Sequence, residues 1–247
     1  MAVAVRAARA LPAPGPDAIT APRSARRGFS MTDAAVARAN MVESQLRPSR
    51  IDDPGVLAAM GAVPRERFVP AVLRDCAYGD EDLALGGGRF LIEPLALGKL
   101  LQAALPASRD VTLLVGDVTG YAAAVLSRLV GSICSLVPPG VASAPVEKLL
   151  AAEGCDNVVF EQGPPDGGRP ERAPFDLIVL IGSVTDLPPA LLLQLGPDGR
   201  LVSVVEHGRS GQVVLARRVR DAIGRISPFD AQIHRLPGLS REPAFSF

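Results

Sequence analysis

The stretch from residue 111 to residue 126 constrains the fold of this chain more than any other. It starts as an apolar run, passes through a turn with Gly116 and Gly120, and continues as an alanine-rich segment. This order is typical of a β-strand, a tight turn and the first turns of an α-helix. A glycine turn between a parallel strand and a helix is the geometry of a nucleotide-type cofactor loop. The stretch therefore predicts an α/β fold with a ligand site at the carboxyl end of this strand.

Strand and helix patterns alternate after this loop. Residues 177–181 form an apolar run, which is typical of a strand covered on both faces. Strand, helix and strand in repeated order predict a parallel sheet with right-handed crossovers. A turn at 208–211 between two extended stretches predicts a closing antiparallel hairpin. The strands are expected around 111–115, 133–137, 157–160, 176–181, 200–206 and 212–219, and the helices around 120–129, 142–153 and 188–194.

Helical patterns dominate the part that precedes this alternation. The first runs from Thr32 and is closed by Pro48. Asp53 followed by proline predicts a second helix start, with an acidic N-cap and proline at the first helical position. Glu93 followed by proline predicts a third. Residues 78–88 between them predict a loop that is acidic at Asp80, Glu81 and Asp82 and ends in three glycines.

Residues 1–30 have a different composition, with five arginines, several prolines and a single acidic residue. Such a segment could be a targeting peptide. It could also be a disordered tail, or translation could start at Met31 instead. We favour the disordered tail or the later start over the targeting peptide. We therefore expect an N-terminal extension at 1–30 and one domain at 31–247. That domain would consist of a helical part at 31–105 and a Rossmann-like core at 106–247.

Charge and cysteine content limit the classes of function. The 26 basic and 26 acidic residues balance, so we expect no broad nucleic-acid surface. No apolar run approaches the ~20 residues that a membrane span needs, so we expect no membrane partner. Cys76, Cys134 and Cys155 lie far apart and form no CxxC motif, which argues against a disulfide framework or a metal site and favours a reduced, cytoplasmic setting. The acidic loop is expected to be solvated rather than a cation site.

Several segments together resemble the protein-L-isoaspartate O-methyltransferase family. The opening motifs MVESQLRP at 41–48 and VLAAMGAVPRERFVP at 56–70 carry most of the resemblance. It continues through Ala77 and Tyr78, the loop with Gly116 and Gly120, APFD at 173–176 and QLGPDGRLV at 194–202. It covers the chain from about Asn40 to the C-terminus.

This resemblance implies a fold and a reaction. The fold is a Rossmann-like S-adenosylmethionine-methyltransferase sandwich, with a mostly parallel seven-stranded sheet, a C-terminal antiparallel hairpin and an N-terminal helical segment. The reaction is methylation of isoaspartyl carboxylates in damaged proteins, with S-adenosyl-L-methionine (SAM) as cofactor and those proteins as partners. Because a carboxylate is already ionised at neutral pH, it attacks the sulfonium methyl without a base, and catalysis consists mainly of positioning and desolvation.

The resemblance also assigns cofactor positions, several of which carry an unexpected side chain here. The assigned positions are Gly116, Asp117, Val118, Thr119, Gly120, Val137, Gly163 and Pro164. Leu114, Val137 and Pro164 stand where the family has acids for the amino-acid end, the ribose and the adenine of the cofactor. Val118 replaces a glycine and restricts the backbone. Asp117 or Asp166 would be the available stand-ins for a lost acid.

The positions at which the family binds the methyl acceptor also carry apolar side chains in this chain. Phe90 and Ile92 stand at the family's Thr and Ser positions, and neither side chain can form a hydrogen bond. No catalytic residue can therefore be named. Two hypotheses follow, an active isoaspartyl methyltransferase and a catalytically silent member that no longer binds SAM and acts as a binding or scaffold protein. Both His207 and His234 are expected to be solvated. The oligomeric state and any protein partner of the silent form do not follow from the sequence.

Overall fold

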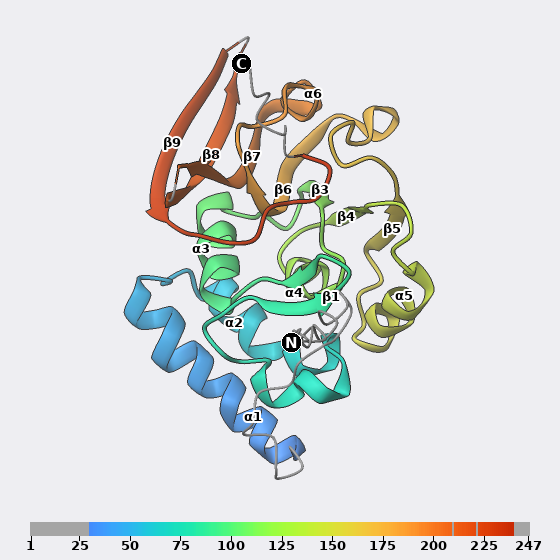
Figure 1. The fold of residues 1–247 in the computed structure, drawn as a ribbon. Coiled ribbons are helices and arrows are strands. Elements are labelled where there is room, and N and C mark those ends of the chain that lie inside the picture. Colours follow the sequence, from blue (N-terminus) through green and yellow to red (C-terminus); the bar gives the residue numbers. More distant parts are fainter. Residues whose placement is uncertain (1–29, 209, 221, 240–247) are drawn as a thin grey trace, which may run out of the picture.

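The computed structural model describes residues 30–208, 210–220 and 222–239, so the predicted extension at 1–30 lies outside it except for Ser30. Seven strands form one sheet in the order β5-β4-β3-β6-β7-β8-β9 (Figure 1). The strand order reverses between β3 and β6, which is a topological switch point. The strands are β3 Val111–Val115, β4 Ser132–Val137, β5 Val158–Gln162, β6 Phe175–Val184, β7 Leu195–His207, β8 Ser210–Val219 and β9 Ala222–Asp230.

The pairing within the sheet is mostly parallel. β3 pairs in parallel with β4 and β6, β4 with β5, and β6 with β7. β8 is antiparallel to both β7 and β9. This arrangement confirms the expected mostly parallel seven-stranded sheet with a C-terminal antiparallel hairpin.

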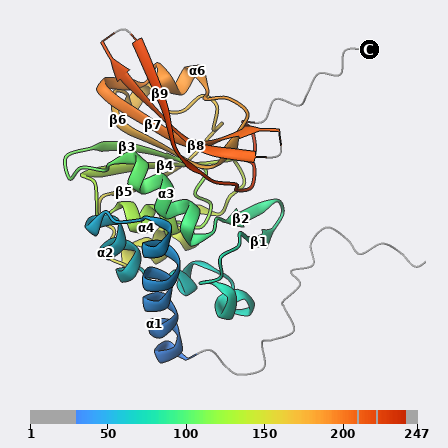
Figure 2. The same cartoon turned by 90° about the vertical axis from the view of Figure 1, so that its left-hand side faces the viewer.

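The helices lie on both faces of the sheet. Figure 2 shows α1 to α4 on one side and α6 on the other. Leu114 of β3 belongs to the apolar cluster with the N-terminal helices, whereas its neighbours Leu113 and Val115 belong to a second cluster with Leu191 of α6, as the strand period of two requires. The helices are α1 Met31–Asn40, α2 Pro54–Ala62, α3 Pro94–Ala104, α4 Tyr121–Leu126, α5 Ser143–Ala152 and α6 Pro189–Leu192; a π-helical segment at Met41–Leu46 extends α1.

Three strands, β1, β2 and β9, were not expected from the sequence. β1, Leu83–Gly86, lies in the segment that was predicted as a loop and pairs with β2, Arg89–Leu91. Gly87 and Gly88, both with positive φ, turn the chain between them. β9 is largely exposed, so it lacks the apolar alternation that identifies a half-buried strand. Asp53 caps α2 as expected, with its Oδ1 accepting a hydrogen bond from the Val56 N–H at 2.8 Å.

None of the helices that the structure describes between residues 30 and 239 has both the length and the apolar character needed to cross a bilayer.

Arg65 ties the N-terminal helical part to the sheet domain. Its side chain is fully buried and donates to the carbonyl oxygens of Ala77 and Ile92. The guanidinium carbon lies 4.8 Å from the centroid of the Tyr121 ring, at the start of α4. One buried cation thus joins the segment after α2, the segment before α3 and the helix that follows the glycine loop.

Replacing Arg65 with alanine should destabilise the protein strongly. The substitution leaves two buried carbonyl groups without donors, and hydrogen bonds to charged groups contribute about 1.5–3 kcal/mol each. We expect Arg65→Ala to lower the free energy of unfolding by about 3–5 kcal/mol in urea denaturation. Arg74→Ala, which removes an exposed arginine on the adjacent turn, should change it by less than about 0.5 kcal/mol. Equal losses in the two variants would contradict this account of Arg65.

Candidate functional site

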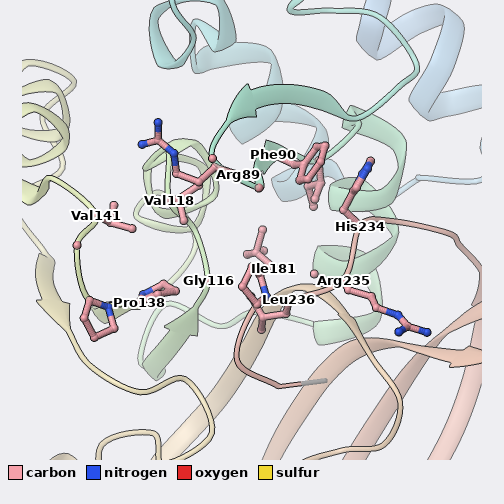
Figure 3. Close-up of a pocket in the computed structure, with 17 residues that line it drawn as sticks. Arg89, Phe90, Gly116, Val118, Pro138, Val141, Ile181, His234, Arg235 and Leu236 are labelled. Atoms are coloured by element: carbon pink, nitrogen blue, oxygen red, sulfur yellow. The ribbon is translucent and has the colours of Figure 1, made fainter. Parts of the chain in front are cut away.

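A pocket of about 450 Å³ lies at the carboxyl ends of β3 and β6 (Figure 3). Open α/β sheets bind their ligands in this crevice, beside the point where the strand order reverses. Five segments build its walls: the loop after β3 at 116–118, the β4–α5 connection at 138–141, β6 at 181–182, the β1–β2 hairpin with Ile92, and the C-terminal residues 234–237.

Gly116 is required by the backbone and by the space around it. Its φ of +89° lies in the region that favours glycine. A β-carbon at this position would collide with Cδ1 of Leu236 and would stand 3.1 Å from the carbonyl oxygen of Ile181. The glycine therefore serves close packing in the chain itself, whether or not a cofactor binds.

Asp117 stabilises its own loop rather than facing the pocket. The buried carboxylate accepts hydrogen bonds from the Thr119 N–H, the Thr119 hydroxyl and the Gly120 N–H through Oδ1, at 3.2, 2.9 and 3.0 Å. Its Oδ2 accepts from the Ala123 N–H at 2.8 Å. Burial raises the pKa of Asp117, and these donors oppose the rise. Asp117 is buried and does not line the pocket, so the structure gives no support to its use as a substitute for a cofactor acid.

Of the other predicted cofactor positions, only Val118 lines this pocket, next to Gly116. Thr119 and Gly120 do not line it. Val137 is fully buried at the end of β4, and the following Pro138 lines the pocket instead. Gly163 lies against the Arg169 guanidinium. Pro164 and the alternative acid Asp166 are exposed, and neither belongs to the pocket lining.

The two predicted acceptor positions do meet in the pocket, together with His234. Phe90 and Ile92 both line it. The rings of Phe90 and His234 are stacked, with centroids 3.4 Å apart and an angle of 15° between the planes. His234 Nδ1 lies 2.6 Å from Asp82 Oδ2, which also accepts a hydrogen bond from the His234 N–H at 2.9 Å.

His234 is exposed, as expected, but it also has a partner, Asp82, that the sequence did not indicate. Asp82 precedes it by 152 residues, and no local pattern signals a partner at that distance. His207, by contrast, is exposed at the end of β7, as expected.

The C-terminal strap, residues 231–237, closes one side of the pocket. The Ser183 N–H donates to the His234 carbonyl at 2.8 Å, and the Leu236 N–H donates to the Ser183 carbonyl at 2.9 Å. The Arg235 guanidinium binds the Glu206 carboxylate at 2.7–2.8 Å, which lowers the pKa of Glu206. These contacts fix the strap on β6 and β7, so that the Leu236 side chain packs against Gly116.

An acidic cavity lies on the other side of the strap. Asp80, Glu81, Asp82, Glu93 and Glu206 line it with His234 and Arg235. Burial, reinforced by Asp80 and Asp82, raises the pKa of Glu93 to about 7.

Within the described parts of the chain, no three His, Cys, Asp or Glu side chains are placed to hold a metal ion, and the three cysteines are free.

Comparison with known proteins gives a consistent family. Residues 37–230 match the model of the family described as protein-L-isoaspartate(D-aspartate) O-methyltransferase. Protein-L-isoaspartate O-methyltransferase 1 of Rhodopseudomonas palustris is 37% identical over 181 residues, which cover 73% of this chain and 74% of that protein. The protein-L-isoaspartate O-methyltransferase of Methylorubrum extorquens is 39% identical over 196 residues, covering 79% and 86%.

Solved structures agree on the fold. A protein-L-isoaspartate O-methyltransferase superposes with a TM-score of 0.69 at 22% identity, over 82% of this chain and 67% of that one. A putative protein-L-isoaspartate O-methyltransferase from Plasmodium falciparum, solved in complex with S-adenosyl-L-homocysteine, superposes with a TM-score of 0.67 at 19% identity, over 81% and 98%. Both support the Rossmann-like methyltransferase fold.

Removing the Asp117 carboxylate should cause a large loss of stability. Asp117→Ala deprives four buried donors of their acceptor, so we expect the free energy of unfolding to fall by about 2–4 kcal/mol. Asp166→Ala removes an exposed acid from the loop after β5 and should change it by less than about 0.5 kcal/mol. Urea denaturation of both variants measures the difference. A neutral Asp117→Ala would mean that the loop does not need these bonds.

Glu93 should make the stability depend on pH. Its pKa rises from 4.5 to about 7 on folding, so the folded state holds the proton more tightly than the unfolded state does. Its contribution is therefore fully present below about pH 4.5 and is lost as the pH rises through 7. We expect Glu93→Gln to lose less stability than the wild type between pH 5 and pH 8.

The matched control for Glu93 is Glu81→Gln, which neutralises an exposed acid in the same loop region. It should keep the wild-type pH profile in thermal or urea unfolding. A parallel profile for Glu93→Gln and the wild type would show that the Glu93 carboxyl titrates alike in both states.

Proposed function

Since the chain belongs to the protein-L-isoaspartate(D-aspartate) O-methyltransferase family, we propose that its activity is methyl transfer from SAM to isoaspartyl carboxylates of damaged proteins. The observation that carries this proposal is that one pocket joins the glycine loop after β3 to the acceptor positions Phe90 and Ile92. Donor and acceptor of a methyl group must meet in one such cavity, because the transfer is an in-line displacement. Isoaspartyl proteins would be the partners, and the cytoplasm would be the location.

The donor set of the pocket does not match SAM. The cofactor carries a sulfonium and an ammonium cation and two ribose hydroxyls, which acidic side chains would bind, and one carboxylate, which a cationic side chain would bind. Among the described residues that line the pocket there is no carboxylate, and the ionised side chains are those of Arg89 and Arg235. The carboxylate of Asp117 is engaged by its own loop. The residues present therefore supply position and volume but no acidic partner for the two cations of the cofactor, and we assign no catalytic step to them.

This mismatch favours a second candidate, a family member that is catalytically silent. Val118 and Leu236 place branched apolar side chains beside Gly116, where the family's cofactor would approach. A site that loses the partners of a charged ligand forfeits about 1.5–3 kcal/mol for each hydrogen bond. Such a chain would keep the fold and the pocket and would act as a binding protein.

Calorimetry combined with a transfer assay separates the two candidates. S-adenosylhomocysteine is titrated into the full-length protein, and methyl transfer is measured on an isoaspartyl peptide and on its aspartyl isomer. The methyltransferase proposal expects binding in the micromolar range and transfer to the isoaspartyl peptide alone. If no heat is measured at millimolar ligand and no methyl group is transferred, the methyltransferase proposal is contradicted and the catalytically silent family member is supported.

Val118→Gly tests whether the side chain at 118 limits cofactor binding. Removing the isopropyl group restores the glycine that the family carries and opens space beside Gly116, so we expect the affinity for S-adenosylhomocysteine to rise several-fold, about 1 kcal/mol. Val219→Ala, at the exposed end of β8, is the control and should leave the affinity unchanged. If both variants bind like the wild type, then Val118 is not what weakens the site.

A further inference from the structure

The acceptor side of the pocket is built from two segments that the seven-stranded sheet does not join. The β1–β2 hairpin and the residue after it supply Phe90 and Ile92, and the strap supplies His234. In the described part of the chain, β1 and β2 pair only with each other. Figure 2 shows this hairpin apart from the strands of the large sheet. Its distance from the strap must therefore be set by side-chain contacts.

The strap itself is fixed on the sheet. The Ser183 N–H donates to the His234 carbonyl at 2.8 Å, and the Ser183 carbonyl accepts from the Leu236 N–H at 2.9 Å. Glu206 of β7 binds the Arg235 guanidinium at 2.7 Å. The strap consequently keeps its place on β6 and β7, and the hairpin is the part of the acceptor side that needs a separate support.

Asp82 connects the hairpin to the strap. It stands directly before β1, and its Oδ1 accepts a hydrogen bond from the Glu93 N–H at 2.7 Å. Its Oδ2 accepts from the His234 N–H at 2.9 Å and lies 2.6 Å from His234 Nδ1. Only 10% of the Asp82 side chain is exposed. One shielded carboxylate thus closes the base of the hairpin and binds the strap at two atoms, and a carboxylate forms stronger hydrogen bonds than a neutral acceptor does.

Both acceptor positions depend on these bonds. Asp82 holds the main chain and the ring of His234 through the same oxygen, and Phe90 stacks on that ring with centroids 3.4 Å apart. Ile92 is joined directly to Glu93, whose N–H binds the other oxygen. Loss of the carboxylate would free Phe90 and Ile92 to move relative to the strap. Asp82 itself does not line the pocket, so it acts through these neighbours.

The other acids of the cavity behind the strap are placed differently. Glu206 is engaged by Arg235 at 2.8 Å, on the sheet side of the strap. Asp80 and Glu81 are exposed. Asp82 is therefore the carboxylate that the structure places between the hairpin and the strap, and Asp80 offers a matched control two residues away.

We propose that Asp82 is a positioning residue for methyl transfer, because its carboxylate holds the hairpin against the strap and thereby sets the gap in which the isoaspartyl side chain lies. This rests on the proposed function, since the gap is the acceptor half of that site. In-line transfer is sensitive to such placement, and a displacement of about 1 Å can cost about a hundred-fold in rate. The donor side is formed by the loop after β3 and the β4–α5 connection, so the effect falls on the acceptor.

Kinetics of Asp82→Ala separate the acceptor from the donor. Methyl transfer to an isoaspartyl peptide is measured with peptide and SAM varied in turn, and binding of S-adenosylhomocysteine is measured by calorimetry. We expect kcat/KM for the peptide to fall about ten- to a hundred-fold and the Kd of S-adenosylhomocysteine to change by less than about two-fold. Asp82→Asn, which keeps one acceptor oxygen, should lose less. The control Asp80→Ala should match the wild type.

His234→Ala tests whether Asp82 acts through the strap. Alone, it should lower kcat/KM for the peptide to a similar extent. Combined with Asp82→Ala, it should add less than about two-fold, because the contact is already lost. Losses that multiply in the double variant would show that Asp82 and His234 act independently, which contradicts the proposal.

Amide hydrogen exchange gives a second readout that needs neither ligand nor activity. The N–H groups of Glu93 and His234 are bound to Asp82, so we expect them to exchange at least about ten-fold faster in Asp82→Ala, with the β3 amides unchanged. Faster exchange in β3 as well would indicate general destabilisation, and Asp82→Asn then carries the comparison. Unchanged exchange at Glu93 and His234 would overturn the proposal.

The outcomes keep this proposal distinct from the proposed function. An inactive wild type would refute methyl transfer and, with it, the role of Asp82 in transfer, whereas the exchange rates would still report whether the carboxylate holds the hairpin. In an active protein, wild-type kcat/KM in Asp82→Ala would refute the positioning role alone. Equal losses for the peptide and for S-adenosylhomocysteine would refute it too, because they indicate a merely structural role.

Discussion

The hydrogen bonds of the Asp117 carboxylate are the constraint on which the site depends. One buried side chain accepts the donors of Thr119, Gly120 and Ala123, so the turn between β3 and α4 is held by the chain itself. A loop that satisfies its own N–H groups keeps its geometry without a bound anion. The same bonds remove the usual anion-binding group of the fold, and they leave the ligand chemistry to the side chains around the pocket.

The strap at 231–237 completes the pocket and also separates it from the acidic cavity. Asp82 and Glu206 draw the polar ends of His234 and Arg235 toward that cavity, while Leu236 faces Gly116. Negative charge is therefore concentrated on one side of the strap, and the pocket side keeps an apolar surface with Arg89 at its rim.

Elements with strong local signals were predicted well. β3, β4 and β6 are apolar runs, and the caps at Asp53 and Glu93 lie where proline follows an acidic residue. β1, β2 and β9 were missed, because short or exposed strands carry no apolar alternation and exist only through their partners. Of the positions named from the sequence, Gly116, Val118, Phe90 and Ile92 line the pocket, whereas Val137, Gly163 and Pro164 do not.

The sequence by itself determined the fold class and the family, because periodicity, turn chemistry and motif spacing are local properties. The tertiary structure alone decided that Asp117 faces its own loop, that His234 meets Asp82 across 152 residues and that Leu236 packs on Gly116. These contacts join segments far apart in the chain. Their existence depends on how the sheet, the hairpin and the strap pack together, which no local pattern encodes.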